Sequence, residues 1–187
     1  MARAARRCTT VSVRRPGAAR SAARAVAEPD DPCTIWYTGR HEIDVRAHST
    51  APPAVVYALL TDGASWPHWS PMVTFGLEQP GDGGGEEVGA IRVFRSRWAV
   101  SRERVVELRP DRRLSYTLLS GIPVRDYRAD VDLEQSDDGT TIRWHSTFDA
   151  KVPGTGWFYR RILGGFVRAC AQGLADHAGA LHKSASA

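Results

Sequence analysis

The sequence is poor in cysteine and lysine and has no long apolar run. Cys8, Cys33 and Cys170 are too few and too scattered for a disulfide framework, and no CxxC pair is present. The zinc-protease pattern HExxH that begins at His41-Glu42 is broken because Val45 occupies the position of the second histidine. We therefore expect no metal site, no cofactor and a reducing, cytoplasmic compartment. No apolar run approaches the ~20 residues of a membrane span, so we also expect no membrane-spanning segment.

The positive charge is unevenly placed. The net charge is +4, and seven arginines precede the first acidic residue, Glu28. Without them, 18 of the 25 basic residues remain against 21 acidic ones, so the charge of the remainder argues against nucleic-acid binding. Arginine outnumbers lysine 23 to 2, as is typical of a GC-rich and therefore bacterial genome.

Residues 1–33 are rich in arginine and alanine and carry almost no large apolar side chain. This composition predicts a disordered tail whose deletion leaves folding intact. Its acid-poor, arginine-bearing start also resembles a transit peptide or a twin-arginine signal, although no hydrophobic segment follows. A solvated tail or a start codon assigned too early are the simpler interpretations. Residues 34–187 then form one domain.

The domain begins with a strand pattern. Apolar and polar residues alternate toward Ser49, and Pro52 and Pro53 fit only the first turn of a short helix that ends near Asp62. A second helical turn follows and contains Trp66 and Trp69. These two indoles either plug the end of the core or form the wall of a pocket.

After Pro71 the chain predicts six antiparallel strands separated by turns rich in Gly, Pro and Asp. Their expected ranges are 72–79, 87–96, 98–109, 112–120, 125–136 and 140–150. The alternation is clearest in the last two, where one face of each strand is polar and the other apolar. The apolar face of the sheet requires a cover.

The last periodic segment, Pro153 to Lys183, predicts one long helix that supplies this cover. Large or small apolar residues recur every fourth position, and polar residues occupy the other face. The repeat consists of Phe158, Ile162, Phe166, Cys170, Leu174 and Ala178, and the stripe is widened by Leu163, Val167, Ala171 and Leu181. Such a helix either simply fills a core or also closes a cavity.

This order of elements resembles the helix-grip fold of the START-like, or SRPBCC, superfamily over residues 41–182. The motifs that carry the resemblance are APPAVVYALLTD, WPHWSPMV, VGAIRVF, ERVVELRPDRRLSY, SGIPVRDYRADV and DGTTIRWHSTF. Their succession is similar to the polyketide cyclase/dehydrase and lipid-transport branch. The resemblance implies an α+β fold in which a curved antiparallel sheet of about seven strands wraps around the C-terminal helix, with two short helices after the first strand.

The resemblance also implies a hydrophobic small molecule, lipid or polyketide-like, bound between sheet and helix. The residues that we expect to line this cavity are Trp66, Trp69, Phe94, Tyr116, Trp144, Phe148, Ile162, Phe166 and Cys170. The protein would then be a monomer or a homodimer.

Polar residues could add chemistry to such a cavity, and Glu103 and Tyr127 are the candidates for acid-base catalysis. Alternation along SRERVVEL places Glu103 outside, whereas the corresponding strand of the related plant-hormone receptors turns its glutamate inward; a bulge would reconcile the two, and we favour the inward position. We expect the Tyr127 phenol to bond Glu103. The nearby arginines Arg92, Arg95, Arg102 and Arg104, each taken singly, fit a solvated strand face better.

Three functions remain open at this point. The first is a carrier or sensor of a hydrophobic small molecule, and the second is a polyketide cyclase/dehydrase-like enzyme that assists aldol closure or dehydration. The third is a protein-interaction module with a residual cavity. The motifs of other enzyme classes, GxSxG, the Walker lysine motif and GxGxxG, are absent.

Overall fold

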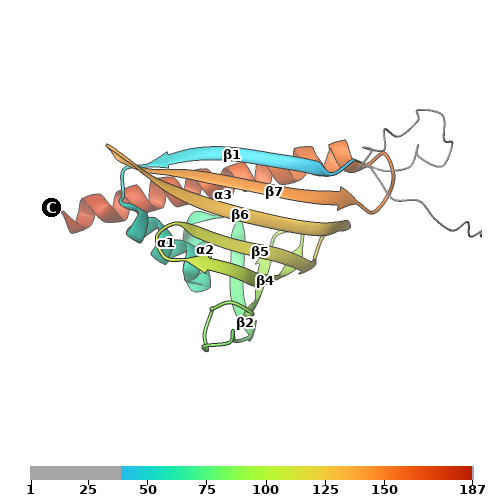
Figure 1. Ribbon diagram of the computed structural model, residues 1–187, viewed down its shortest axis with the longest axis horizontal. Helices are drawn as coiled ribbons and strands as arrows, with labels where there is room; N and C mark the ends of the chain where they lie inside the picture. Colours follow the sequence, from blue (N-terminus) through green and yellow to red (C-terminus); the bar gives the residue numbers. More distant parts are fainter. Residues whose placement is uncertain (1–38, 187) are drawn as a thin grey trace, which may run out of the picture. The chain divides into compact units, whose positions relative to one another are not determined.

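The computed structural model describes residues 39–186, and these form a curved sheet with a long helix against it (Figure 1). The tail expected at residues 1–33 lies outside the described residues, as does the strand pattern before residue 39. None of the described helices has the length and hydropathy needed to cross a membrane. The described residues also hold no cluster of His, Cys, Asp and Glu suited to a metal ion.

The elements follow the predicted order. The helical elements are α1 (Pro53–Thr61), the short 3-10 turn η2 (Gly63–Ser65), α2 (Trp66–Trp69) and α3 (Gly156–Ala185). The strands are β1 (His41–Ser49), β2 (Met72–Gln79), β3 (Ile91–Ser96), β4 (Val100–Arg109), β5 (Arg113–Ser120), β6 (Val124–Ser136) and β7 (Gly139–Ala150). The expected helix-grip fold is confirmed.

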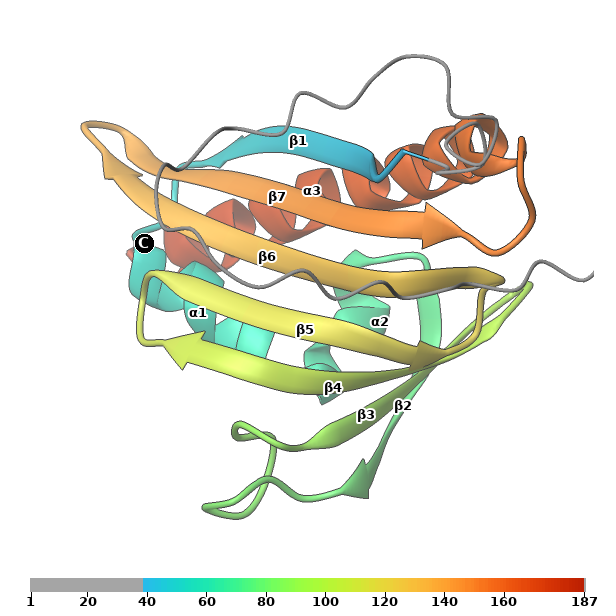
Figure 2. The ribbon, with the colours of Figure 1, turned by 45° about the vertical axis from the view of Figure 1, so that its right-hand side comes forward.

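The seven strands form one antiparallel sheet in the order β1-β7-β6-β5-β4-β3-β2. Helix α3 runs behind β1, β7 and β6, while α1 and α2 lie beside its C-terminal half (Figure 2). The opposite face of the sheet is polar, as predicted. It carries ion pairs such as Arg113 with Asp132 at 2.5 Å and His145 with Asp132 at 3.1 Å.

The buried stripe of α3 differs from the predicted one at its N-terminal end. Leu163, Val167, Cys170, Leu174 and Ala178 face the sheet, whereas Phe158 is 46% and Ile162 51% exposed. The reason is geometric, because a residue four positions on is rotated by about 40° at 3.6 residues per turn. Five such steps turn the predicted four-residue repeat around to the far side of the helix, so that repeat cannot stay on one face.

Glycine has different uses along α3. A Cβ at Gly173 would lie 1.8 Å from the carbonyl oxygen of Trp69, so this glycine allows α2 and α3 to approach. A Cβ at Gly164 or Gly165 would meet no atom within 4 Å. The close approach to α3 therefore occurs at Gly173 and not at Gly164 or Gly165.

Candidate functional site

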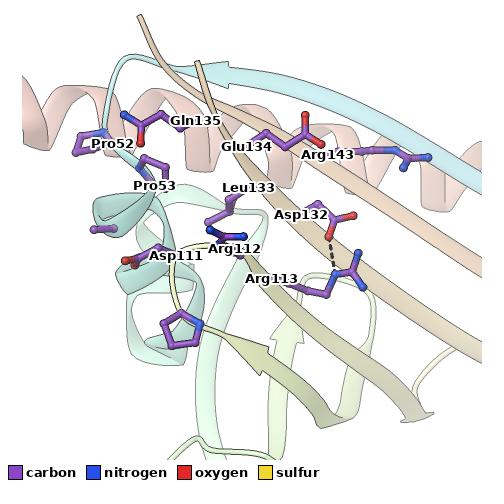
Figure 3. Close-up of a pocket in the computed structure, with 12 residues that line it drawn as sticks. Pro52, Pro53, Asp111, Arg112, Arg113, Asp132, Leu133, Glu134, Gln135 and Arg143 are labelled. Carbon is purple, nitrogen blue, oxygen red and sulfur yellow. Dashed lines mark hydrogen bonds and ion pairs between the residues drawn. The ribbon is translucent and has the colours of Figure 1, made fainter. Parts of the chain in front are cut away.

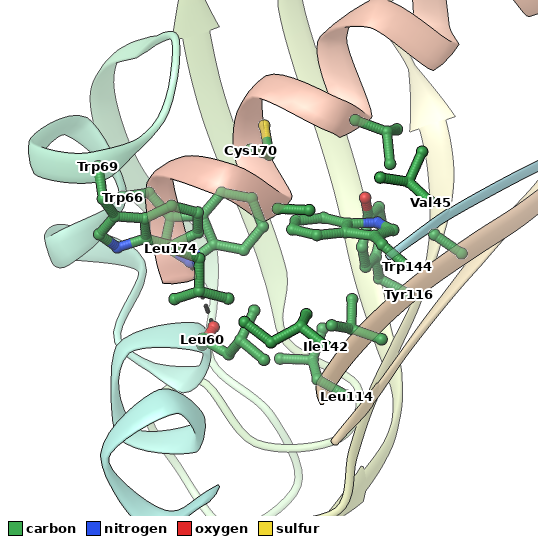
Figure 4. Packing of buried hydrophobic residues seen from close by; sticks show 14 of the residues in the cluster. Val45, Leu60, Trp66, Trp69, Leu114, Tyr116, Ile142, Trp144, Cys170 and Leu174 are labelled. Carbon is green, nitrogen blue, oxygen red and sulfur yellow. Dashed lines mark hydrogen bonds between the residues drawn. The ribbon is translucent and has the colours of Figure 1, made fainter. Parts of the chain in front are cut away.

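The space between the sheet and α3 holds one cluster of buried side chains (Figure 4). Most of the predicted cavity residues belong to it, with exposed fractions of 6% or less: Trp66, Trp69, Phe94, Tyr116, Trp144, Phe148 and Cys170. Phe166 is partly buried and packs against the cluster. Ile162 lies outside it, on the exposed side of α3.

Trp66 occupies the centre of the aromatic part of this cluster. Its ring centroid lies 4.7 Å from that of Phe94, 4.8 Å from that of Trp69 and 5.8 Å from that of Trp144. The indole of Trp66 donates to the carbonyl of Leu60 at 3.2 Å, and the indole of Trp69 donates to Ser65 Oγ at 2.9 Å. These two indoles are therefore fixed by local hydrogen bonds, and they offer only apolar surface to the interior.

Two polar atoms of β7 are less well paired. The indole Nε1 of Trp144 and the hydroxyl of Ser146 are buried and make no hydrogen bond of normal length and angle to a residue that the structure describes. Looser contacts join Trp144 to the Tyr116 phenol and Ser146 to the Tyr127 phenol, and each opposes the rise in phenol pKa that burial causes. Both side chains are 1% exposed, and as residues i and i+2 of a strand they point to the same inward face. Leaving a buried donor unpaired costs about 1–3 kcal/mol.

Two phenols adjoin these atoms. The ring of Tyr116 lies 6.5 Å from that of Trp144 and 6.3 Å from that of Tyr127. Burial raises the pKa of Tyr127 to about 12 and raises the pKa of Tyr116 well above its usual value. Burial likewise raises the pKa of the Cys170 thiol, so the cysteine is an uncharged, poorly nucleophilic group.

Glu103 lies inside, at 3% exposure, where it pairs with Arg92. Both Arg92 Nε, at 3.1 Å, and Nη2, at 2.6 Å, donate to Glu103 Oε1. Arg92 is fully buried, and its guanidinium lies 5.1 Å from the Trp66 ring centroid and 5.3 Å from that of Phe94. Burial raises the pKa of Glu103 more than Arg92 lowers it.

A change of register explains why simple alternation misplaced Glu103. The pairing of β4 with β5 shifts between Val105 and Glu107, so Glu103 and Val105 face inward although the residues beyond the shift follow the opposite parity. Tyr127, the expected partner of Glu103, makes no described hydrogen bond to it. Arg92 donates to Glu103 instead.

The inward position of Arg92 was not foreseen. The strand IRVF does contain a signal, since Arg92 has the same parity as Phe94 and must share its face. Arg102, by contrast, is partly exposed and pairs with Glu78. Arg95 and Arg104 are exposed, as expected of a solvated strand face.

Glu86, which is partly buried, is a third member of this charge cluster that the sequence did not reveal. It comes from the glycine-rich loop between β2 and β3, accepts from the amide of Gly63 at 2.9 Å, and lies 3.6 Å from Arg92 Nη1. Burial raises its pKa. A Cβ at Gly63 would lie 2.2 Å from Phe75, so only glycine fits there. The cluster thus links the loop, η2 and the sheet.

Two grooves lie apart from this interior. One, of about 870 Å³, runs over the outer edge near α1 and the β4–β5 turn, where Arg113 pairs with Asp132 (Figure 3). The other, of about 430 Å³, lies between β1 and α3 and is lined by Arg160, Arg161 and Arg168. The walls of the first groove are mixed, with Pro52, Pro53 and Leu133 beside charged residues, whereas the walls of the second are mainly polar.

Comparison with known proteins agrees with this architecture. The family described as polyketide cyclase / dehydrase and lipid transport matches residues 40–179. A search of the curated proteins gave no significant match.

Solved structures with the same fold are numerous. A START superfamily protein from Mycobacterium smegmatis has a TM-score of 0.65 at 14% identity, over 75% of this chain and 99% of its own. A protein from Thermobifida fusca has a TM-score of 0.63 at 27% identity, over 75% of this chain and 94% of its own. Ginseng major latex-like protein 151 from Panax ginseng has a TM-score of 0.59 at 11% identity, over 74% of this chain and 97% of its own. The solved structures share the fold, and the family match over residues 40–179 shows that this chain belongs to the polyketide cyclase / dehydrase and lipid transport family.

Proposed function

We propose that the protein binds an apolar small molecule that carries an oxygen acceptor, in the interior between the sheet and α3. The observation that carries this proposal is a pair of buried polar atoms on the inward face of β7, Trp144 Nε1 and Ser146 Oγ. They make no hydrogen bond of normal geometry to a described residue and have only looser contacts with the Tyr116 and Tyr127 phenols. The family and the fold support the same class of ligand.

The chemistry of the two atoms defines the ligand. An indole N–H can only donate, and a serine hydroxyl can donate or accept. A carbonyl or hydroxyl oxygen placed between them would satisfy both, and the aromatic rings around them would hold the apolar body. Binding would then remove the cost of the two poorly paired atoms, which gives the ligand both affinity and orientation.

Access to the interior requires movement, because most of its side chains are already in contact. The N-terminal half of α3 is the part suited to move. Leu163 and Val167 pack this half against the sheet, but its aromatic residues Tyr159 and Phe166 are only partly buried against the cluster. A Cβ at the adjacent Gly164 or Gly165 would meet no atom within 4 Å. We propose that the ligand enters by displacing this half of the helix from the cluster.

A second candidate is enzymatic, and the state of Glu103 favours it. Both described hydrogen bonds to this carboxylate go to Oε1, which leaves Oε2 available for proton transfer, and burial raises its pKa. Glu103, with Tyr127 as a second polar group, would then assist aldol closure or dehydration of a bound polyketone. Conversion of a reactive polyketone that is lost in Glu103→Gln while binding persists would establish this function.

The binding proposal is tested with two probes of equal shape. Acetylnaphthalene carries a carbonyl acceptor, and ethylnaphthalene lacks it. In calorimetric titrations we expect Ser146→Ala to weaken the binding of acetylnaphthalene about five- to tenfold, which corresponds to roughly one hydrogen bond. The affinity for ethylnaphthalene should stay unchanged. Thr147→Ala, on the outer face of the same strand, is the matched control. Equal affinity of both probes for the unmodified protein would contradict the proposal.

A further inference from the structure

The end of the molecule at which α3 begins exposes large apolar side chains. Trp98, in the β3–β4 hairpin, is 91% exposed, and Trp157, in the first turn of α3, is 69% exposed. Val152, in the loop before α3, is 54% exposed, and Phe158 and Ile162 are about half exposed. We call these five residues the apolar rim.

Strand pairing places the members of the apolar rim at one end of the molecule. Arg102 pairs with Ser120, so the β3–β4 hairpin adjoins the β5–β6 loop, and Val124 pairs with Ala150, so that loop adjoins the start of the β7–α3 connection. Figure 2 shows these three connections and the first turn of α3 at the same end. Exposed tryptophans gathered in this way mark a surface that contacts something other than water.

Basic side chains surround the apolar rim. None of the six pairs with an acidic residue in the part of the chain that the structure describes, and all are exposed: Arg40, Arg97, Arg125, Lys151, Arg160 and Arg161. The acidic side chains nearby are fewer and comprise Glu42, Asp126 and Asp149. The surface therefore presents a positive border around apolar and indole groups.

Helix α3 carries an apolar strip and a basic strip side by side. At about 100° per residue, Phe158 and Ile162 lie within about 40° of each other, and Arg161 and Arg168 lie within about 20° of each other on the neighbouring strip. Trp157 lies on the basic strip, about 20° from Arg168. An apolar strip beside a basic strip is typical of a helix that lies in the interface of a membrane with anionic lipids. Tryptophan also prefers this interface, where its ring meets the acyl boundary and its N–H meets the head groups.

We propose that the apolar rim docks reversibly on an anionic lipid surface. Trp98, Trp157, Phe158 and Ile162 enter the head-group region, and the surrounding basic residues contact the acidic head groups. This role is independent of which ligand the interior binds. If the interior binds an apolar molecule, docking also places the movable half of α3 at the surface from which such a molecule would come.

The test is sedimentation of the full chain with vesicles, either pure phosphatidylcholine or an equimolar mixture with phosphatidylglycerol. We expect binding to the anionic vesicles, weakened by salt. Ile162→Glu should reduce the partition coefficient about tenfold or more, because a charge would have to enter the apolar layer. Leu181→Glu is the matched control, since Leu181 is 43% exposed on the same helix but at its other end, and it should change the partition less than about twofold.

The arginines of residues 1–33 will also attract anionic vesicles, so sedimentation alone does not locate the contact. Vesicles with brominated acyl chains quench indoles that reach the acyl boundary. We expect quenching that decreases in Trp98→Phe and in Trp157→Phe. Absence of quenching, or equal partition of Ile162→Glu and Leu181→Glu, would overturn the proposal. A dimer that Ile162→Glu dissociates, without quenching by vesicles, would show that a second copy covers the rim instead.

Discussion

Arg92 is the side chain whose environment is most demanding. It is fully buried, donates to Glu103 and to the carbonyl of Leu60 at 3.3 Å, and lies near two aromatic rings. A buried charge that loses its partner retains its full desolvation cost, whereas a pair replaced as a whole by apolar groups can be neutral. The ion pair is therefore coupled, and its two members must be tested together.

For this pair we predict a non-additive response. Glu103→Gln should lower the free energy of unfolding by about 3 kcal/mol, because Arg92 is left with only the more distant Glu86. The double variant Arg92→Met with Glu103→Leu should recover most of that loss. Urea denaturation measures the free energy of unfolding of the single and the double variant. The matched control is Glu78→Gln, which breaks an exposed pair with Arg102 and should hardly move the midpoint. Additive losses in the double variant would disprove the coupling.

The buried phenols predict a specific response to alkali. Because the folded-state pKa of Tyr127 is raised from 10.0 to about 12, the folded protein keeps this proton while the unfolded chain loses it. Stability contributed by the protonated phenol is present below pH 10 and falls as the pH rises toward 12. We expect Tyr127→Phe to leave the phenolate absorbance gained up to about pH 11 unchanged. A smaller gain in the variant would show that Tyr127 ionises as a solvated tyrosine.

At the scale of elements, α3 shows what a sequence pattern can and cannot supply. The period of its apolar residues predicted the helix and its contact with the sheet. It did not predict which side of the N-terminal half is covered, because a repeat of four residues drifts around the helix, so that Phe158 and Ile162 are exposed while Leu163 and Val167 are buried. Only the partner surface decides that question.

The glycines of α3 give opposite predictions for the same substitution. Gly165→Ala should raise the free energy of unfolding by about 0.5–1 kcal/mol, since alanine favours the helix and the added methyl meets no atom within 4 Å. Gly173→Ala should lower it by about 1–3 kcal/mol, since the methyl would collide with the carbonyl of Trp69. Thermal or urea unfolding of the two variants decides this. If both changes had the same sign, the close approach of α2 and α3 would be wrongly placed.

At the scale of the whole molecule, the fold could be predicted because each strand and turn carries its own local signal. The order of these signals predicted seven strands, the two short helices and the long helix. The interior could be predicted only in part. Aromatic residues on inward faces were found by alternation. The Arg92–Glu103 pair, in contrast, depends on a register shift in β4, and its neighbour Glu86 comes from a loop that no periodic pattern describes. Long-range pairing of charges is a property of the assembled sheet.

The same assembled interior supports the proposed function, and the indole N–H signals of the protein in solution test it most directly. Trp144 should report a ligand that binds inside, and Trp98 and Trp157 should report one that binds on the apolar rim. Replacement of each tryptophan by phenylalanine assigns the signals. On titration with acetylnaphthalene we predict that the Trp144 N–H signal moves downfield to a saturating value as it gains a hydrogen bond, and that ethylnaphthalene causes no such downfield movement. If only the signals of Trp98 and Trp157 respond while that of Trp144 stays in place, the interior is a closed core and the account is wrong.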